Sequence, residues 1–571
     1  MSRIKLAVRI LTLAALLASV IGPLTVTPAQ ASPLLQTVAF TGQELLGRPT
    51  DSSILLTIVP DATIEVYYEY GTSPGAYIGQ TSPATAAGGQ AHKTTITGLS
   101  ANTKYYYRMQ YRTSGGSWVA RAERSFWTQR APGAAFTFTI TSDSHVNIML
   151  GNAGTWTQTM NNVAADHPDF LIDLGDTFAM DNVTTVSGAE SAYRYQRQFF
   201  DLVGHSASIF IAPGNHEQEE GWHLDDTGNP ATSQPVLSTN ARKKYYPNPV
   251  PDGFYTGNPD TYSYLDGDQL HENYYAWTWG DVLFVVIDPF WYTTVKPYTG
   301  NTGGGETSDT GSGDRWDWTL GLQQFNWLKQ TLENSNATYK FIFSHHMVGG
   351  LDDYVRGGAN GAHICEWGGY NEAGNTYEWA ARRPGWGEKP VHQILIDNNV
   401  NAFFHGHDHQ YGYEMRDGVV YQSLPAAGFS GNGFGYYTTG NGYTIQGLPS
   451  PGHLRVTVTP SQATVDYVAT SSGAVTYSYT IEGQTGNGTL GDVDGNGAAN
   501  STDALIILSC DAGLDTTDYC PMNCGDANGD GAVNSTDALV ILTYDTGASV
   551  PFPVGVAGCP ASVTPCPGCA P

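Results

Sequence analysis

The sequence has no long apolar run and little positive charge. None of its 571 residues lies in a stretch approaching the roughly 20 apolar residues of a membrane-spanning helix, so we expect no membrane span. Lys and Arg number 26 against 53 Asp and Glu, which gives a net charge of −27 at pH 7. Because nucleic-acid phosphates would be repelled by such a surface, this composition argues against nucleic-acid binding.

Basic residues and cysteines are also unevenly distributed. The chain contains no Lys or Arg after Arg455, so the carboxylates of this last segment have no basic partners, which is typical of metal ligands. Six of the seven cysteines lie between Cys510 and Cys569, whereas Cys365 stands alone. In an exported chain such a cluster indicates disulfides, although the sequence leaves their pairing open.

Residues 1–31 have the pattern of a secretory signal peptide. Positive charges at Arg3, Lys5 and Arg9 precede an apolar run over residues 11–21, and Ala29-Gln30-Ala31 provides small residues for cleavage. We therefore expect a secreted protein that is extracellular or associated with a cell surface. An uncleaved membrane anchor is the alternative.

Residues 33–130 show short stretches of alternating polar and apolar residues, separated by Gly, Pro and Ser. This pattern predicts a small β-sandwich. The segment Leu99–Tyr107 resembles the tyrosine corner of fibronectin type III domains, with Tyr105 as the corner residue. The resemblance implies a positioning role for this all-β domain.

Between residues 135 and 481, five apolar runs each end in residue types that bind metals. The sequences that follow these runs are Asp143-Ser144-His145, Gly175-Asp176, Gly214-Asn215-His216-Glu217, Ser344-His345-His346 and Gly406-His407-Asp408-His409. Because the strands of an α/β sheet present their carboxyl ends at one edge, we expect these side chains to converge. Carboxylate, amide and imidazole ligands together favour zinc, manganese or iron.

At these residues the chain resembles the calcineurin-like metallophosphoesterases, over about residues 135–425. The resemblance implies a four-layer α/β domain, a β-sandwich flanked by helices, with a centre of two divalent or mixed-valence transition metals (Zn, Mn or Fe). It assigns Asp143, His145 and His409 to the first metal. It assigns Asn215, His345 and His407 to the second metal, and Asp176 to the bridging position between them. His346 is the alternative to His345.

A β-sandwich before such a domain is also the arrangement of purple acid phosphatases. Those enzymes have a Tyr three residues after the bridging Asp, where this chain has Ala179, and they lack a His in the first motif, where it has His145. We therefore expect no iron–tyrosinate centre. The more common family pattern, with an Asp at the position of Ala179, is also missing.

The resemblance implies hydrolysis of a phosphate monoester, a small-molecule substrate, by a hydroxide that bridges the two metals. His216 would contact the phosphate and protonate the leaving group as general acid. One alternative is a phosphodiesterase or nucleotidase with the same centre. Another, of a different class, is a calcium-dependent scaffold-binding or surface protein with incidental hydrolase activity.

A Gly-, Thr- and Asn-rich linker is expected at residues 482–490, and residues 491–550 then contain two twelve-residue calcium loops that begin 34 residues apart. The expected calcium ligands are, in the first loop, Asp492, Asp494, Asn496, Ala498, Asn500 and Asp503, and in the second, Asp526, Asn528, Asp530, Ala532, Asn534 and Asp537. Each loop continues into an apolar segment that predicts a helix.

This duplicated loop and helix, with Asp at the last loop position, resembles the type I dockerin domain, a small α module. The resemblance implies two bound calcium ions and a cohesin-bearing scaffold protein as partner. The residues that would contact the cohesin are Ser501, Thr502, Ser535 and Thr536. A calcium-stabilised cap without a cohesin is the alternative, because the inserted cysteines and the cysteine-rich tail at residues 551–571 are unusual for the family.

Overall fold

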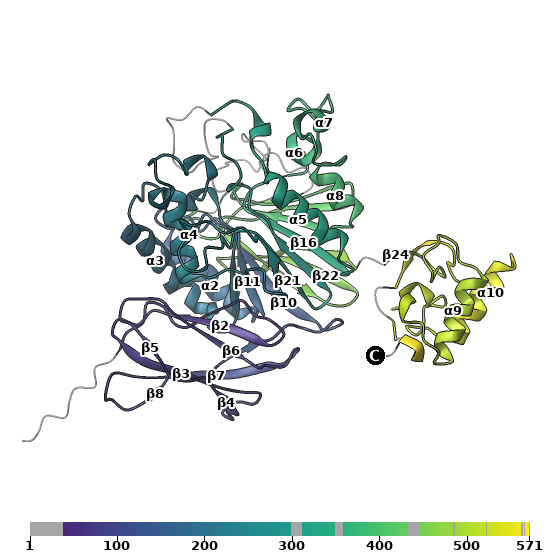
Figure 1. Cartoon of the computed structure of the whole chain (residues 1–571), viewed down its shortest axis with the longest axis horizontal. Helices are drawn as coiled ribbons and strands as arrows, with labels where there is room; N and C mark the ends of the chain where they lie inside the picture. Colours follow the sequence, from purple (N-terminus) through teal and green to yellow (C-terminus); the bar gives the residue numbers. More distant parts are fainter. Residues whose placement is uncertain are drawn as a thin grey trace, which may run out of the picture. The chain divides into compact units, whose positions relative to one another are not determined.

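The computed structural model describes residues 38–297, 311–348, 358–431, 433, 446–483, 486–520, 522–560, 563–564 and 566–569 (Figure 1). The signal peptide expected at residues 1–31 lies outside these ranges. Within them, no helix combines the length and the apolar character needed to cross a membrane.

The N-terminal part of the chain folds into two antiparallel sheets (Figure 1). The smaller sheet contains β1 (Leu45–Gly47), β2 (Ser53–Ile58) and β6 (His92–Thr97). The larger contains β3 (Ile64–Gly71), β4 (Gly79–Gln80), β5 (Ala84–Ala86), β7 (Lys104–Arg112), β8 (Val119–Ala120) and β9 (Arg124–Trp127). Along most of β3, buried residues alternate with half-buried ones, as a strand with one face in the core requires.

Tyr105 lies at the start of β7 in this β-rich region. Its ring is buried, and its hydroxyl accepts a hydrogen bond from the backbone N–H of Ser100 at 3.0 Å. This is the contact that a tyrosine corner makes. The assignment of the region to the fibronectin type III fold stays a prediction.

Two sheets form the centre of the middle domain. The first has the order β12 (Ser208–Ile211), β11 (Phe170–Asp173), β10 (Phe136–Thr141), β21 (Gly452–Val458), β22 (Gln462–Ala469) and β23 (Val475–Glu482). The second has the order β13 (Thr256–Gly257), β14 (Tyr275–Trp279), β15 (Val282–Val286), β16 (Tyr339–Ser344), β17 (Ala402–His405), β19 (Val419–Ser423), β18 (Tyr411–Arg416) and β20 (Gln446–Leu448). Strands β10, β11 and β12 are parallel, as are β15, β16, β17 and β19.

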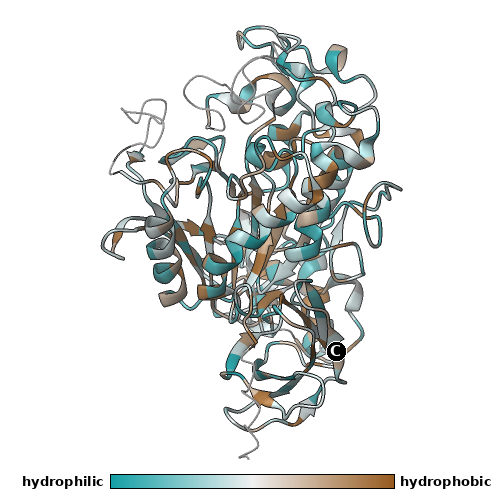
Figure 2. Cartoon of the chain, turned by 90° about the vertical axis from the view of Figure 1, so that its left-hand side faces the viewer, coloured by the Kyte–Doolittle hydropathy of each residue, from teal (hydrophilic) through white to brown (hydrophobic). Residues whose placement is uncertain are grey.

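An apolar core joins the two sheets face to face. Phe138 of β10 lies edge-on to Phe284 of β15, with ring centroids 5.0 Å apart, and Phe343 stacks on Phe404 within the second sheet. Figure 2 shows apolar residues, in brown, along these central strands. Such aromatic pairs stabilise the fold beyond the area that they bury.

Helices cover the outer face of each sheet. Helices α2 (Ala153–Ala165), α3 (Val186–Gly204) and α4 (Gln234–Tyr245) cover the first sheet, where Trp156 and Phe200 are buried with Ile209 of β12. Helices α5 (Gly321–Glu333), α6 (Cys365–Gly368), α7 (Trp379–Arg382) and α8 (Val391–Asp397) cover the second, where Phe325 packs with Ile342 of β16. The sequence of layers, helix–sheet–sheet–helix, confirms the predicted α/β fold class.

The C-terminal part contains two helices of equal length, α9 (Ser501–Asp511) and α10 (Ser535–Asp545). Strand β24 (Gly486–Thr489), inside the expected linker, pairs antiparallel with β25 (Ala557–Cys559) in the cysteine-rich tail. Single turns of 3-10 helix occur at Asn215–Glu217 (η1), Gly221–His223 (η2), Pro230–Thr232 (η3), Arg315–Asp317 (η4), Gly361–His363 (η5), Thr517–Tyr519 (η6), Asn523–Gly525 (η7) and Pro567–Cys569 (η8).

Candidate metal centre

The structure brings the seven predicted metal ligands together in the middle domain. They follow β10, β11 and β12 of the first sheet and β16 and β17 of the second. Two groups each place their ligand atoms within 4.8 Å of one another: Asp143, His145, Asp176 and His409 form one, and Asp176, His345 and His407 form the other. Asn215 belongs with the second group, because its Oδ1 lies 3.1 Å from His345 Nε2.

Asp176 is common to both groups, and its environment fits a cation. Its Oδ2 atom is buried and accepts no hydrogen bond from the described residues, although His345 Nε2 lies 3.1 Å away and His145 Nε2 3.5 Å away. Leaving a buried carboxylate oxygen without a hydrogen bond is costly, and a bound cation would remove that cost. Together with the mixed oxygen and nitrogen donors, this oxygen fits a divalent metal.

Charges in the centre depend strongly on one another. Burial lowers the pKa of His145 and His345, but Asp143 and Asp176 outweigh it and raise these values to about 10 and about 9. Burial conversely opposes ionisation of the two carboxyls, yet the surrounding imidazoles hold the pKa of both below its ordinary value. The pocket therefore keeps its carboxylates charged by surrounding them with cationic groups, a role that a metal ion also fills.

The backbone at the predicted ligands is strained. Five of them have φ angles in the left-handed region that favours glycine, namely Asp143 (55°), His145 (51°), Asp176 (54°), His407 (69°) and His409 (57°). Non-glycine residues adopt this conformation rarely, and each one costs on the order of 1–3 kcal/mol. Strain concentrated in this way is typical of functional sites, where the surrounding fold holds side chains in positions that they would not otherwise take.

Glu217 ties two of the ligand loops together. Its buried carboxylate accepts hydrogen bonds from the backbone N–H groups of Gly214 (2.5 Å), Asp176 (2.8 Å), Thr177 (2.9 Å) and Phe178 (2.8 Å). The loop after β11 and the loop after β12 are thereby joined through one side chain. The sequence placed Glu217 in a motif but did not reveal this role, because the four donors come from backbone that only the fold brings together.

His216 is held by a carboxylate that the sequence did not indicate. Its Nδ1 lies 2.9 Å from both carboxylate oxygens of Asp181, and its ring centroid is 5.1 Å from that of His145. The Met180 N–H donates to the His216 carbonyl at 3.1 Å, which places Asp181 beside the ring. With Nδ1–H donated to Asp181, Nε2 is the nitrogen left to act on a substrate.

The two predicted calcium loops form matching structures in the C-terminal part. Asp492 accepts hydrogen bonds from the N–H groups of Asn496 and Gly497, and Asp526 accepts them from those of Asp530 and Gly531. In the first loop, Asp492, Asp494 and Asp503 place carboxylate oxygens within 4.8 Å of one another.

The ninth and twelfth positions of each loop also start the following helix. Asn500 and Asp503 form a capping box on α9, and Asn534 and Asp537 form one on α10. The predicted cohesin-contacting residues lie in the first turns of these helices and are exposed: Ser501, Thr502, Ser535 and Thr536.

The two helices cap each other. Asp545, the last residue of α10, accepts a hydrogen bond from the N–H of Ser501 at 2.9 Å. Asp511, the last residue of α9, accepts one from the N–H of Ser535 at 3.0 Å. Each carboxylate therefore lies at the N-terminus of the neighbouring helix, where negative charge is favourable.

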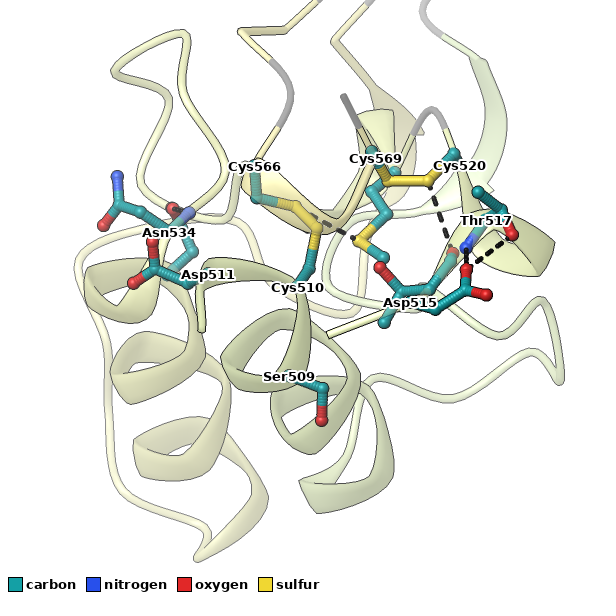
Figure 3. The surroundings of a disulfide bond; sticks show 12 residues. Ser509, Cys510, Asp511, Asp515, Thr517, Cys520, Asn534, Cys566 and Cys569 are labelled. Carbon is teal, nitrogen blue, oxygen red and sulfur yellow. Dashed lines mark hydrogen bonds between the residues drawn. A yellow bond between two sulfur atoms is a disulfide. The ribbon is translucent and has the colours of Figure 1, made fainter. Parts of the chain in front are cut away.

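Three disulfides connect the helical module with the tail, and Figure 3 shows two of them, Cys510–Cys566 and Cys520–Cys569. They pair Cys510 with Cys566, Cys520 with Cys569, and Cys524 with Cys559, so the clustered cysteines are disulfide-bonded as expected. Each joins the segment 510–524 to the segment 559–569. Thr564 of the tail also exchanges backbone hydrogen bonds with Gly531 and Val533 of the second calcium loop.

Two family models match the chain. Residues 136–411 match the model described as calcineurin-like phosphoesterase, and residues 490–544 match the dockerin type I domain. The central domain is a calcineurin-like phosphoesterase. No curated protein sequence is detectably similar to the chain.

Solved structures resemble the fold of this phosphoesterase. The structure of PhoD has 16% sequence identity and a TM-score of 0.54, and the match covers 79% of this chain and 92% of PhoD. A purple acid phosphatase from yellow lupin seeds has 14% identity and a TM-score of 0.49, with 77% of this chain and 74% of that chain covered. At these identities the likeness concerns the fold alone.

Of the two neighbouring histidines after β16, the phosphoesterase domain presents His345 to Asp176. His345 Nε2 lies 3.2 Å from His407 Nδ1, and His345 Nδ1 lies 2.7 Å from the Leu174 carbonyl, which fixes the ring. His346 instead stacks on Trp318, with ring centroids 4.3 Å apart, and its Nδ1 donates to the Met347 carbonyl. This geometry supports His345 as the ligand.

Replacing Glu217 by Gln is expected to weaken metal binding in the phosphoesterase domain. The amide keeps one acceptor and turns an N–H group towards backbone donors, so the two loops lose part of their connection. We expect about a 10- to 100-fold loss of metal affinity, the usual cost of disturbing groups that orient ligands. Metal titration by calorimetry measures it, with the exposed Glu333→Gln on α5 as the matched control. Unchanged affinity in Glu217→Gln would contradict this role.

Proposed function

We propose that this chain is a secreted phosphoesterase that hydrolyses phosphate monoesters at a centre of two transition metals. The observation that carries the proposal is the position of Asp176, whose carboxylate belongs to two groups of potential ligands at once. A phosphodiesterase or nucleotidase could use the same centre, so the ester class is part of the test below.

Each metal would have its own protein ligands. Those of the first would be Asp143, His145 and His409, those of the second Asn215, His345 and His407, with Asp176 shared. Bound zinc, manganese or iron would supply positive charge that stabilises the phosphoryl oxygens and makes a water molecule more acidic. The protein's own contribution is to fix these side chains, through a strained backbone and through Glu217, before substrate arrives.

His216 would donate the proton that the leaving alkoxide requires. Asp181 accepts the Nδ1–H of the ring, which fixes the tautomer and stabilises the imidazolium, so that Nε2 carries the transferable proton. Asp181 is therefore a positioning residue. The common family pattern has an Asp at the position of Ala179, two residues earlier in this chain.

His216→Ala is expected to lower kcat while the metal content stays intact. Loss of a general acid costs about 10²- to 10⁴-fold. Asp181→Asn should lower kcat less, because its amide oxygen still accepts from Nδ1, and should shift the pH profile of kcat, which a purely structural role would not. Steady-state kinetics with metal analysis separates these effects. Equal loss of metal and turnover in His216→Ala would contradict the assignment.

The decisive experiment loads the purified mature chain with zinc, manganese or iron in turn. Metal content is measured, and turnover of aryl phosphate monoesters and diesters is compared for each metal. We expect two metals per chain and faster turnover of monoesters. Faster turnover of diesters would favour a phosphodiesterase, and no turnover with a full metal complement would favour a calcium-dependent surface or scaffold-binding protein.

The C-terminal module would attach this enzyme to a scaffold. Two calcium ions would neutralise its loops, and the exposed first turns of α9 and α10 would contact a cohesin through their Ser-Thr pairs. Binding of the full chain to a panel of cohesins, with and without a calcium chelator, tests this proposal. Calcium-dependent capture supports it, whereas calcium-independent binding or no binding supports a stabilising cap.

A further inference from the structure

Apolar side chains form one wall of the metal centre. A hollow that opens to solvent is lined on one side by Asp143, His145 and His409. Its other lining residues are apolar: Met149, Leu150, Ala426 and Phe429. None of the described residues that line it is a Lys or Arg.

Leu150 is the least expected member of this wall. Its side chain is 51% exposed, and its φ of 51° lies in the left-handed region that bulky residues avoid. Exposure and strain both disfavour a leucine here, whereas Asn would tolerate the conformation better. Neither the backbone conformation nor the exposure of this position favours a leucine. A leucine is expected here if its side chain contacts a ligand.

The wall is held in place by backbone pairing between two distant loops. Gly151 and Phe429 form a bridge, the Ser430 N–H donates to the Leu150 carbonyl at 3.0 Å, and the Asn152 N–H donates to the Gly428 carbonyl at 2.8 Å. A Cβ atom at Gly428 would collide with the Ser144 carbonyl, so the loop passes directly against the first metal motif. These backbone contacts fix the loops that carry the apolar residues next to the first metal motif.

We propose that Met149, Leu150 and Phe429 form a subsite for the organic group of the substrate. A phosphoryl group at the centre would place the carbon atoms of its ester next to this wall, where an aryl or alkyl group buries apolar surface. A polyol or a second phosphate would meet apolar carbon in place of hydrogen-bond partners. The phosphoesterase therefore prefers esters with apolar groups. This inference rests on the proposed function.

The test compares benzyl phosphate with glycerol phosphate, because both release an alkoxide and differ mainly in the polarity of the organic group. In the wild-type chain, kcat/KM is expected to favour benzyl phosphate. Leu150→Asn suits the left-handed backbone and removes the apolar contact, so it should lower kcat/KM for benzyl phosphate about tenfold, mainly through KM. The value for glycerol phosphate should change much less, and the metal content should stay the same.

A second variant repeats the kinetic test, and a binding measurement tests the subsite without turnover. Met149→Gln is expected to act in the same direction, whereas Leu322→Asn, an exposed leucine on α5, is the matched control and should have no effect. Binding of benzylphosphonate, which is not hydrolysed, should weaken in Leu150→Asn by the same factor as KM rises.

Three outcomes separate this inference from the function on which it rests. A loss that is equal for both esters, or no loss in either variant, would overturn the apolar subsite while leaving the phosphoesterase proposal intact. Failure of the metal-loaded wild-type chain to hydrolyse either ester would overturn the proposed function. In that case, weaker binding of benzylphosphonate to Leu150→Asn than to the wild-type chain would still support the apolar contact.

Discussion

Asp176→Asn is expected to remove both metals from the phosphoesterase domain and to abolish turnover. The side chain belongs to both groups of predicted ligands, and its Oδ2 is the buried oxygen that lies between His145 and His345. An amide at this position cannot supply negative charge to two cations. Because hydrolysis near neutral pH needs a water whose pKa is lowered towards about 7, we expect kcat to fall by more than about a thousandfold.

The comparison with His409→Ala sharpens this expectation. His409 belongs to one group alone, so its loss should release about one metal per chain, whereas Asp176→Asn should release both. Metal analysis after dialysis, together with turnover of an aryl phosphate, measures the difference. Asp417→Asn, an exposed carboxylate with φ of 50°, is the matched control because Asn tolerates the same backbone. Two metals retained in Asp176→Asn would refute the shared position.

Removal of calcium alone is expected to leave the C-terminal module folded, and removal of calcium together with reduction is expected to unfold it. The three disulfides close segments of 56, 49 and 35 residues, and each closure stabilises a fold by about 4 kcal/mol when the unfolded chain is otherwise free. The closed segments overlap, so the contributions are not additive. Even one of them is comparable with the whole stability of a small module.

Limited proteolysis of the full chain measures this outcome, with cleavage sites mapped between residues 490 and 571. A calcium-selective chelator should produce little cleavage there, a reductant alone should also produce little, and the two together should expose the module. Cys365, the described cysteine outside the disulfides, is buried in the middle domain, so reduction acts on the module. Full digestion by chelator alone would show that the disulfides do not replace the calcium ions in holding the fold.

The metal centre was predictable because its residues follow strands. Asp143, Asp176 and His407 each come directly after an apolar run, and the rule that parallel strands end at one edge is enough to expect them together. The four-layer α/β fold was expected from the family resemblance that these motifs carry. The resemblance already assigned His345, with His346 as the alternative, and the structure shows that His345 is the one that faces Asp176.

Other functional features depend on how distant loops meet, which a local pattern does not encode. Asp181 reaches His216 because Met180 binds the backbone of His216. Phe429 pairs with Gly151, the residue after Leu150, across a gap of more than 270 residues in the sequence. The expected linker at residues 482–490 likewise contains β24, because its partner strand lies in the tail. Composition indicated a linker there but gave no information about its pairing.

The reciprocal caps of α9 and α10 connect the two predicted calcium loops, so we expect calcium binding at one loop to depend on binding at the other. A calcium ion in the first loop orders the start of α9, and the far end of that helix carries Asp511, which holds the start of α10. The second loop acts back on the first through Asp545. Since coupling between sites is reciprocal, we expect each calcium ion to raise the affinity for the other, so that the module fills as a unit over a narrow range of calcium concentration.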